Sequence, residues 1–198
     1  MTEIGRRLVH VSGTGLPALY LLDLVTWREL QYLLAAGLLV AGVLEFFRLF
    51  VGLDWWVYRR LTREYERGNP AGYALYFVSL TAVAFLFDPP VAVPGMLMLT
   101  VGDPISGLLG SNDAGRGKRL GVLAAMFGVC FLLAVPFTTS QAASVPWLVG
   151  VAAAAAGAAG ATLADGVKPV VATYVIDDNL SIPPAACVAI WAVLLLGG

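Results

Sequence analysis

The chain has 198 residues, of which 59% are hydrophobic and only 13% are charged, and its mean hydropathy is +0.82. An ordinary soluble domain has about 25% charged residues. The composition therefore excludes a soluble globular protein and predicts an integral membrane protein. The formal net charge of −1 provides no basic surface of the kind that binds nucleic acid, so we expect no nucleic-acid partner.

Seven apolar segments are candidates for membrane-spanning helices, which need about 20 mostly apolar residues. They cover residues 5–24, 29–51, 71–87, 90–110, 120–138, 146–165 and 181–197. The first begins like a signal peptide, but the run from Val11 to Leu22 lacks an A-x-A-like cleavage site, so we interpret it as a retained helix. The predicted fold is all-α, a single polytopic membrane bundle of about seven transmembrane helices formed by residues 1–198.

Basic residues predict the orientation of this bundle, because cytoplasmic loops of membrane proteins are enriched in Lys and Arg. With a cytoplasmic N-terminus, Arg28 is the only one of the 12 basic residues that falls on the far side. The same topology brings four polar motifs to the cytoplasmic face, namely "EIGRRLVH", "GDPISG", "GRGKR" and "DDNLSIP". We therefore expect a cell-membrane protein whose functional site faces the cytoplasm. The oligomeric state is left open.

The first of these motifs places Glu3, Arg6, Arg7 and His10 on one face of a helix, since residues three and four apart are neighbours there. Two guanidinium groups on this face could bind phosphate. Cytoplasmic anchoring of the first helix explains Arg6 and Arg7 equally well, but it leaves Glu3 and His10 without a role.

The second motif lies in "TVGDPISGLLGSNDAGRGKRLG", where Gly102, Asp103 and Pro104 are expected to break an apolar helix. An acid can hold a divalent cation, and glycines allow a ligand to approach the backbone. The bases that follow can neutralise phosphate oxygens; they are Arg116, Lys118 and Arg119. The motif is not a Walker A loop, because Lys118 is followed by Arg119 and not by Ser or Thr.

The third motif is the acid-rich stretch "DGVKPVVATYVIDDNLSIPPA". Asp177, Asp178 and Asn179 come just before the last predicted span, where one of them is expected to cap the helix. Together with Asp165, the two adjacent acids are also candidates for a metal or substrate site.

In combination, four motifs resemble the polyprenol kinase family, which includes dolichol kinases, phytol kinases and CTP-dependent diacylglycerol kinases. The motifs are E-x-x-R-R-x-x-H at the N-terminus, "LEFFR" in the second span, "GDPISGLLG" in the fourth and "DDNLSIP" before the last. The resemblance covers nearly the whole chain. Two departures are Ser111, where many relatives have a basic residue, and "KRLGV", where many have K-[ST]-x-E-G.

The resemblance implies transfer of the γ-phosphate of a nucleotide, commonly CTP, to the hydroxyl of a membrane lipid such as an isoprenoid alcohol, with Mg²⁺ as cofactor. Together with the residue patterns described above, it gives four groups of candidate site residues. The catalytic candidates are Asp103, His10 and Asp165. The nucleotide- and phosphate-binding candidates are Arg6, Arg7, Gly102, Gly110, Arg116, Lys118, Arg119 and Asn179. The substrate-orienting candidates are Glu3, Glu45 and Arg48, and the metal ligands are Asp103, Asp178 and Asp177.

Two alternatives remain open on the sequence. A CTP-dependent cytidylyltransferase that forms a CDP-lipid needs similar acids and bases. A small transporter or non-catalytic membrane scaffold belongs to a different class, although inverted repeats of the kind found in many transporters are not evident. The general base is also undecided between His10 and a carboxylate.

Overall fold

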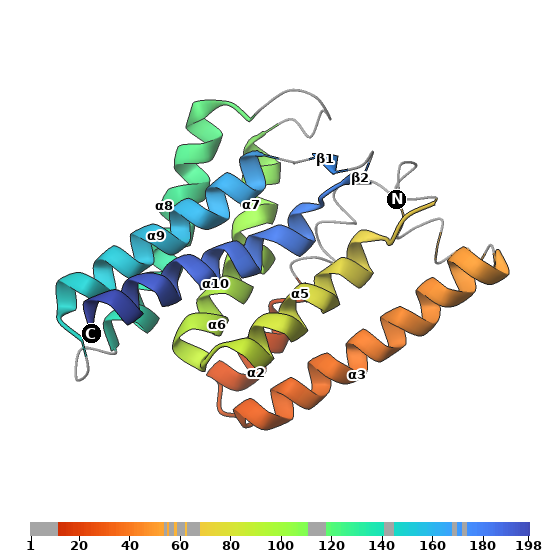
Figure 1. Cartoon of the computed structure of the whole chain (residues 1–198), viewed down its shortest axis with the longest axis horizontal. Coiled ribbons are helices and arrows are strands. Elements are labelled where there is room, and N and C mark those ends of the chain that lie inside the picture. The colour runs from red at the N-terminus through yellow and green to blue at the C-terminus, as the bar shows by residue number, and fades with distance from the viewer. Residues whose placement is uncertain are drawn as a thin grey trace.

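The structure is a computed structural model, and it describes residues 12–53, 55, 58, 62, 68–110, 118–140, 145–167, 170–171 and 174–198. The described chain is almost entirely helical (Figure 1). The helices that begin before residue 100 are α2 (Gly15–Leu21), α3 (Trp27–Phe46), η1 (Phe47–Val51), α5 (Gly72–Leu86), α6 (Pro89–Leu97) and η3 (Met98–Gly102). Those after it are α7 (Asp103–Leu109), α8 (Leu120–Thr139), α9 (Trp147–Gly166) and α10 (Asp178–Gly197).

Five helical segments of the described chain are long and apolar enough to cross a membrane. They are Trp27–Val51, Pro89–Leu109, Leu120–Thr139, Trp147–Gly166 and Asp178–Gly197. The third predicted span corresponds to α5, whose 15 residues extend only about 22 Å at 1.5 Å per residue. Residues 5–11 of the first predicted span lie outside the described residues, and its described part, residues 12–24, contains the seven-residue helix α2. The predicted all-helical fold is therefore confirmed, and five of its described helical segments are candidate membrane spans, where about seven spans were predicted.

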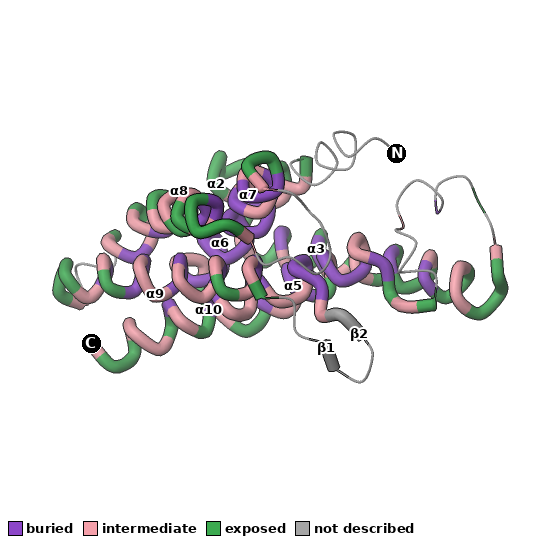
Figure 2. Tube along the Cα trace, turned by 90° about the horizontal axis from the view of Figure 1, so that it is seen from above, coloured by how far each residue is buried: buried purple, intermediate pink, exposed green. Residues whose placement is uncertain are grey.

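The segment Pro89–Leu109 is the central helix of the bundle. In its most apolar window 78% of the residues are buried, against 17 to 33% in the other four candidate spans. Figure 2 shows the same contrast between α6, which is mostly buried, and the neighbouring α8, which is more exposed. The exposed side chains on the outer helices are largely apolar, and Phe50, Leu132 and Leu196 are among the most exposed of them. Such a surface suits contact with lipid.

The prediction that Gly102, Asp103 and Pro104 break this central helix is wrong. The chain passes from α6 through the π-helical turn η3 directly into α7, and Pro104 lies in the first turn of α7. Proline has no N–H to donate to the carbonyl four residues earlier, which is that of Thr100. The wider π-turn accommodates this loss without ending the helix. The hydroxyl of Thr14, the N-cap residue of α2, donates to the Thr100 carbonyl at 3.4 Å.

Helices α9 and α10 run antiparallel and pack side by side (Figure 1). Gly160 makes this packing close, because a Cβ there would lie 2.8 Å from the backbone oxygen of Ala185. The buried face of α9 consists mostly of alanines and glycines, which lets the two backbones approach. As a result, the end of α9 at Asp165 comes close to the beginning of α10 at Asp178.

The connection between α9 and α10 contains a two-residue antiparallel strand pair, β1 (Val170–Val171) with β2 (Tyr174–Val175). The seventh predicted span began at residue 181, but α10 begins at Asp178. The motif "DDNLSIP" therefore forms the first turns of this helix rather than a loop before it.

Helices α3 and α5 form one edge of the bundle (Figure 1). A capping box fixes the start of α3: the Thr26 hydroxyl accepts from the Glu29 backbone N–H at 3.3 Å, and the Glu29 carboxylate accepts from the Thr26 N–H at 2.7 Å. The opposite end of α3 continues into the π-helical turn η1, which ends at Gly52 with a φ of +70°. This end carries the polar residues Glu45 and Arg48.

Candidate functional site

Three carboxylates that are far apart in the sequence meet at one end of the bundle. Asp103 begins α7, Asp165 is next to the last residue of α9, and Asp178 begins α10. One oxygen atom of each lies within 4.8 Å of the others. Asp165 and Asp178 are buried, with 1% and 5% of their surface exposed, and Asp103 is partly exposed. We refer to these three residues as the acid cluster.

Ser106 and Lys118 hold the carboxylate of Asp165. The Ser106 hydroxyl on α7 donates to Asp165 Oδ2 at 2.7 Å, and Lys118 Nζ, just before α8, donates to Asp165 Oδ1 at 2.6 Å. Lys118 Nζ also donates to Ser106 Oγ at 2.9 Å, so the three side chains form a closed triangle. Because each carboxylate oxygen has about two acceptor positions, Asp165 keeps the capacity to bind a further group on each oxygen.

The start of α10 holds the third acid in place. Asp177 is the N-cap of this helix, and its Oδ1 accepts from the backbone N–H of Asn179 at 3.0 Å. The Asn179 side-chain amide donates to the same oxygen, and the Asn179 carbonyl accepts a hydrogen bond from Ser79 on α5. The prediction that one residue of this motif caps a helix is confirmed. The acid cluster contains Asp165 and not the predicted metal ligand Asp177, whose Oδ1 is engaged in the cap.

The chemistry of the acid cluster fits a divalent cation such as Mg²⁺. Carboxylate oxygens are the hard ligands that Mg²⁺ and Ca²⁺ prefer. Carboxylates in apolar surroundings are costly unless they are paired or hold a cation. Lys118 pairs with Asp165 at 2.6 Å, so one positive charge already lies beside the cluster. The residues that would hold the ion are Asp103, Asp165 and Asp178.

Two of the three glycines of the "GDPISGLLG" motif, Gly102 and Gly110, were predicted to bind nucleotide, and both have packing neighbours in the structure. A Cβ on Gly102 would lie 3.0 Å from Cys130 Sγ and 3.2 Å from the Met126 side chain, both on α8. Gly110 follows α7 in an extended conformation, and a Cβ there would lie 3.3 Å from the Ser106 carbonyl. Close contact between η3 and α8 is therefore a sufficient reason for glycine at position 102.

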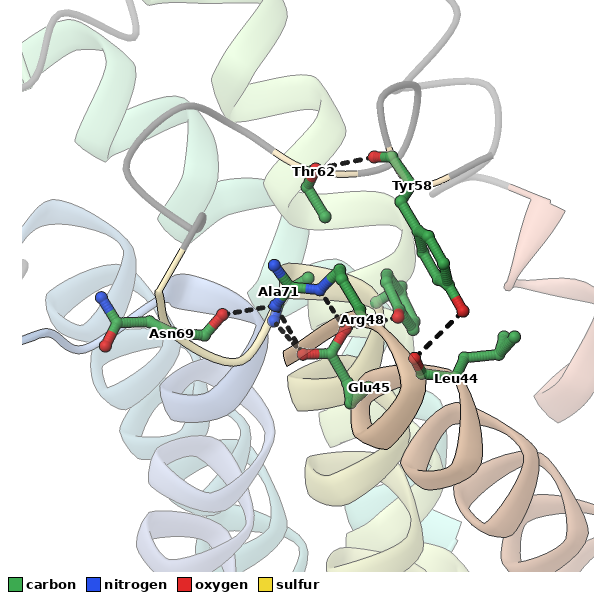
Figure 3. Close-up of polar contacts among 8 residues, drawn as sticks. Leu44, Glu45, Arg48, Tyr58, Thr62, Asn69 and Ala71 are labelled. Atoms are coloured by element: carbon green, nitrogen blue, oxygen red, sulfur yellow. Dashed lines mark hydrogen bonds and ion pairs between the residues drawn. The ribbon is translucent and has the colours of Figure 1, made fainter. Parts of the chain in front are cut away.

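Glu45 and Arg48 belong to a separate polar cluster at the end of α3 (Figure 3). Glu45 is 8% exposed, and its two oxygens accept from Arg48 Nε at 2.9 Å and from Arg48 Nη2 at 2.6 Å. The same carboxylate accepts from the Tyr73 hydroxyl and from the Ala71 N–H at 3.2 Å. Arg48 Nη2 also donates to the Asn69 carbonyl. These contacts fasten α3 to the start of α5. The pair was predicted to orient the substrate, and the structure shows that it also joins two helices.

Five predicted site residues lie outside the part of the chain that the structure describes. They are Glu3, Arg6, Arg7, His10 and Arg116. Arg119 is described and is exposed as the N-cap residue of α8, next to the buried ion pair of Lys118. Of the predicted phosphate-binding bases that the structure describes, Lys118 is therefore the one in direct contact with the acid cluster.

Sequence reasoning missed Ser106. A serine within the apolar run "PISGLLG" is no signal by itself, and its importance comes from Asp165, 59 residues later. One signal was available: Ser106 lies three residues after Asp103, so both belong to the same face of α7.

No protein family, no curated protein and no solved structure matches the chain. The geometry of the acid cluster and the resemblance of the motifs are therefore the features that indicate a function.

Proposed function

We propose that this protein is a membrane lipid kinase, which transfers the terminal phosphate of a nucleotide, with CTP as the expected donor, to the hydroxyl group of a membrane lipid such as an isoprenoid alcohol. The observation that carries the proposal is the meeting of Asp103, Asp165 and Asp178 beside Lys118 at one end of an apolar helical bundle. The motif resemblance to the polyprenol kinase family supports the same reaction.

The position of the acid cluster favours a lipid acceptor. Asp165 and Asp178 lie at helix ends, and Asp103 lies six residues, or about 9 Å, from the end of α7. The hydroxyl of a membrane alcohol resides at this depth, near the boundary between hydrocarbon and water. Apolar side chains near the same helix ends are exposed, among them Leu108, Leu109 and Leu163, at 59 to 65%. A lipid chain could lie against them while its hydroxyl reaches the acids.

The reaction requires little covalent chemistry from the protein, because phosphoryl transfer depends mainly on positioning and charge stabilisation. The bond between the terminal phosphorus and its bridging oxygen breaks, and a bond to the lipid oxygen forms. The lipid hydroxyl proton passes to a base, for which His10 and a carboxylate remain the candidates. Bound Mg²⁺ would neutralise charge on the phosphate oxygens. Asp103, Asp165 and Asp178 would hold it, and Lys118 would bind a phosphate oxygen.

We further propose that the acid cluster faces the cytoplasm of the cell membrane, because the basic residues predict this orientation and nucleotides are available there. Accessibility of single cysteines to a membrane-impermeant thiol reagent in sealed vesicles tests it. A cysteine placed at Arg119 should be labelled from the cytoplasmic side, and one placed at Asp88, at the other end of the central helix, from the opposite side.

The decisive experiment measures product formation by the purified protein in lipid nanodiscs. The protein is incubated with Mg²⁺, CTP or ATP labelled at the γ-phosphate, and a panel of isoprenoid alcohols and diacylglycerol. A lipid kinase transfers the label to one lipid class and releases a nucleoside diphosphate. Release of pyrophosphate with formation of a CDP-lipid would instead identify a cytidylyltransferase. If no lipid is modified while Asp103→Asn leaves the cellular function intact, the protein belongs to the transporter or scaffold class.

A further inference from the structure

The ion pair between Lys118 and Asp165 is buried. Only 8% of the Lys118 side chain and none of the Asp165 side chain is exposed, and Nζ lies 2.6 Å from Oδ1. A buried ammonium interacts strongly with its surroundings, because the effective dielectric constant there is well below that of water. The pair therefore has electrostatic consequences for every group bound nearby.

A divalent cation at the acid cluster would bind next to this ammonium, since Asp165 belongs to both. The two positive charges repel each other. Lys118 thus has two opposite effects on the site. Together with Ser106 it fixes the Asp165 carboxylate, and at the same time its charge weakens the binding of a cation there.

A bound phosphate group would reduce the repulsion between the Lys118 ammonium and the cation. Its oxygens accept strong charge-assisted hydrogen bonds from ammonium groups. Lys118 lies two residues before the start of α8, and lysine has a flexible four-carbon side chain, so a short movement of Nζ can exchange a carboxylate oxygen for a phosphate oxygen. An anion bound beside the cluster then supplies the negative charge that both Lys118 and the cation need.

We propose that Lys118 is an internal counter-cation that makes divalent-cation binding at the acid cluster dependent on a phosphate-bearing co-ligand. The cation alone binds weakly, and the cation together with a nucleotide binds tightly. This inference rests on the proposed function, and it specifies how the same site avoids holding a metal ion when no nucleotide is present.

The test measures binding and requires no catalysis. Mn²⁺ serves as the probe, because the electron paramagnetic resonance signal of the free ion reports the fraction bound, and CDP is the co-ligand. In the unaltered protein we expect CDP to increase Mn²⁺ affinity about tenfold or more. Because binding linkage is reciprocal, Mn²⁺ must increase CDP affinity by the same factor.

Three variants separate the charge of Lys118 from its hydrogen bonds. Lys118→Gln keeps a donor near Asp165 but loses the charge, so it should bind Mn²⁺ alone about tenfold more tightly and lose most of the CDP effect. Lys118→Arg keeps the charge and should keep the CDP effect. Ser106→Ala keeps the charge but loses an orienting hydrogen bond to Asp165, and Mn²⁺ binding should weaken about tenfold both with and without CDP. Arg28→Met removes an exposed charge near the start of α3 and is the matched control.

Two results would overturn the inference. One is equal Mn²⁺ affinity of the unaltered protein with and without CDP. This measurement does not depend on the folding of any variant. The other is weaker Mn²⁺ binding by Lys118→Gln alone, which would show that Lys118 only orients Asp165. If the binding results are as expected but no lipid is phosphorylated, the inference stands and the proposed kinase activity fails.

Discussion

Lys118 Nζ contacts Asp165 Oδ1 at 2.6 Å although 47 residues separate the two in the sequence. The contact joins the segment before α8 to the end of α9, and Ser106 connects both to the central helix. Three helices are thus fastened at the point where the acid cluster lies. The side chains that fasten these helices are therefore the same ones that would form the proposed phosphate-transfer site.

The first prediction concerns Asp103, which is part of the acid cluster and is only partly buried. Asp103→Asn keeps the size of the side chain and removes a charged ligand. Mutation of a residue that only supports a metal ligand commonly lowers metal affinity or activity 10- to 100-fold. Loss of a direct ligand should have a larger effect, so we expect the rate of phosphate transfer to fall about 100-fold or more. Initial rates with labelled CTP provide the measurement. Asp88→Asn is the matched control, because Asp88 is an exposed acid at the opposite end of the central helix. Equal rates in the two variants would contradict a role for the acid cluster.

The second prediction separates the neighbours Asp177 and Asp178. Asp177 caps α10, and removal of an N-cap acceptor costs about 1 kcal/mol. Asp177→Ala should therefore lower the free energy of unfolding by about this amount, while Asp177→Asn should retain the cap and most of the activity. Asp178→Asn should show the reverse pattern, with loss of activity and little loss of stability. Thermal unfolding and initial rates of the same protein preparations distinguish the two. If Asp177→Asn is as inactive as Asp178→Asn, Asp177 belongs to the site.

Sequence patterns predicted some helix boundaries well and others poorly, for physical reasons. The span predicted at 120–138 is Leu120–Thr139, because an apolar run with a charged start marks both ends clearly. The last helix begins three residues earlier than predicted, since Asp177 initiates it and polar residues in a first helical turn resemble a loop in the sequence. The central helix continues through Pro104 because a π-turn absorbs the missing hydrogen bond, which hydropathy does not reveal.

The candidate site was only partly predictable for a related reason. Carboxylates in apolar surroundings stand out in a sequence, so Asp103, Asp165 and Asp178 were all identified. Which of them meet is decided by the antiparallel packing of α9 and α10, and Ser106 gains its role only through that packing. The contact between Glu45 and Arg48, in contrast, follows from the sequence alone. Their spacing of three residues already predicts an ion pair within one helix.

The third prediction concerns the pair of Glu45 and Arg48. Removal of one partner of a buried ion pair leaves the other charge uncompensated and commonly costs about 3 to 5 kcal/mol. We expect Glu45→Gln and Arg48→Met each to lower the free energy of unfolding by about 3 kcal/mol. The double variant should lose less than the sum of the two, because neither partner is then left charged and alone.

Denaturant unfolding in detergent micelles measures these losses. Arg28→Gln, which removes an exposed arginine at the other end of α3, should leave the stability nearly unchanged. Phosphate transfer assayed well below the unfolding transition should persist in Glu45→Gln if the pair is architectural. Loss of transfer in a folded Glu45→Gln protein would instead support the predicted role in orienting the substrate.

The last prediction uses two glycines to test whether the contact between α9 and α10 positions the acid cluster. A Cβ on Gly160 would lie 2.8 Å from the Ala185 backbone oxygen, so Gly160→Ala must push the helices apart. Overpacking of this kind costs about 1 to 3 kcal/mol. Asp165 follows on the same helix five residues later, about one and a half turns on. Its distance from Asp178 should increase, so Mn²⁺ affinity should fall together with stability. Gly128 lies in the middle of α8 with no atom within 4 Å of its added Cβ. Gly128→Ala should therefore be neutral or should stabilise the protein by up to about 1 kcal/mol, because alanine favours a helix over glycine. Unchanged Mn²⁺ affinity in a destabilised Gly160→Ala protein would show that the acid cluster is positioned by contacts other than the packing of α9 against α10.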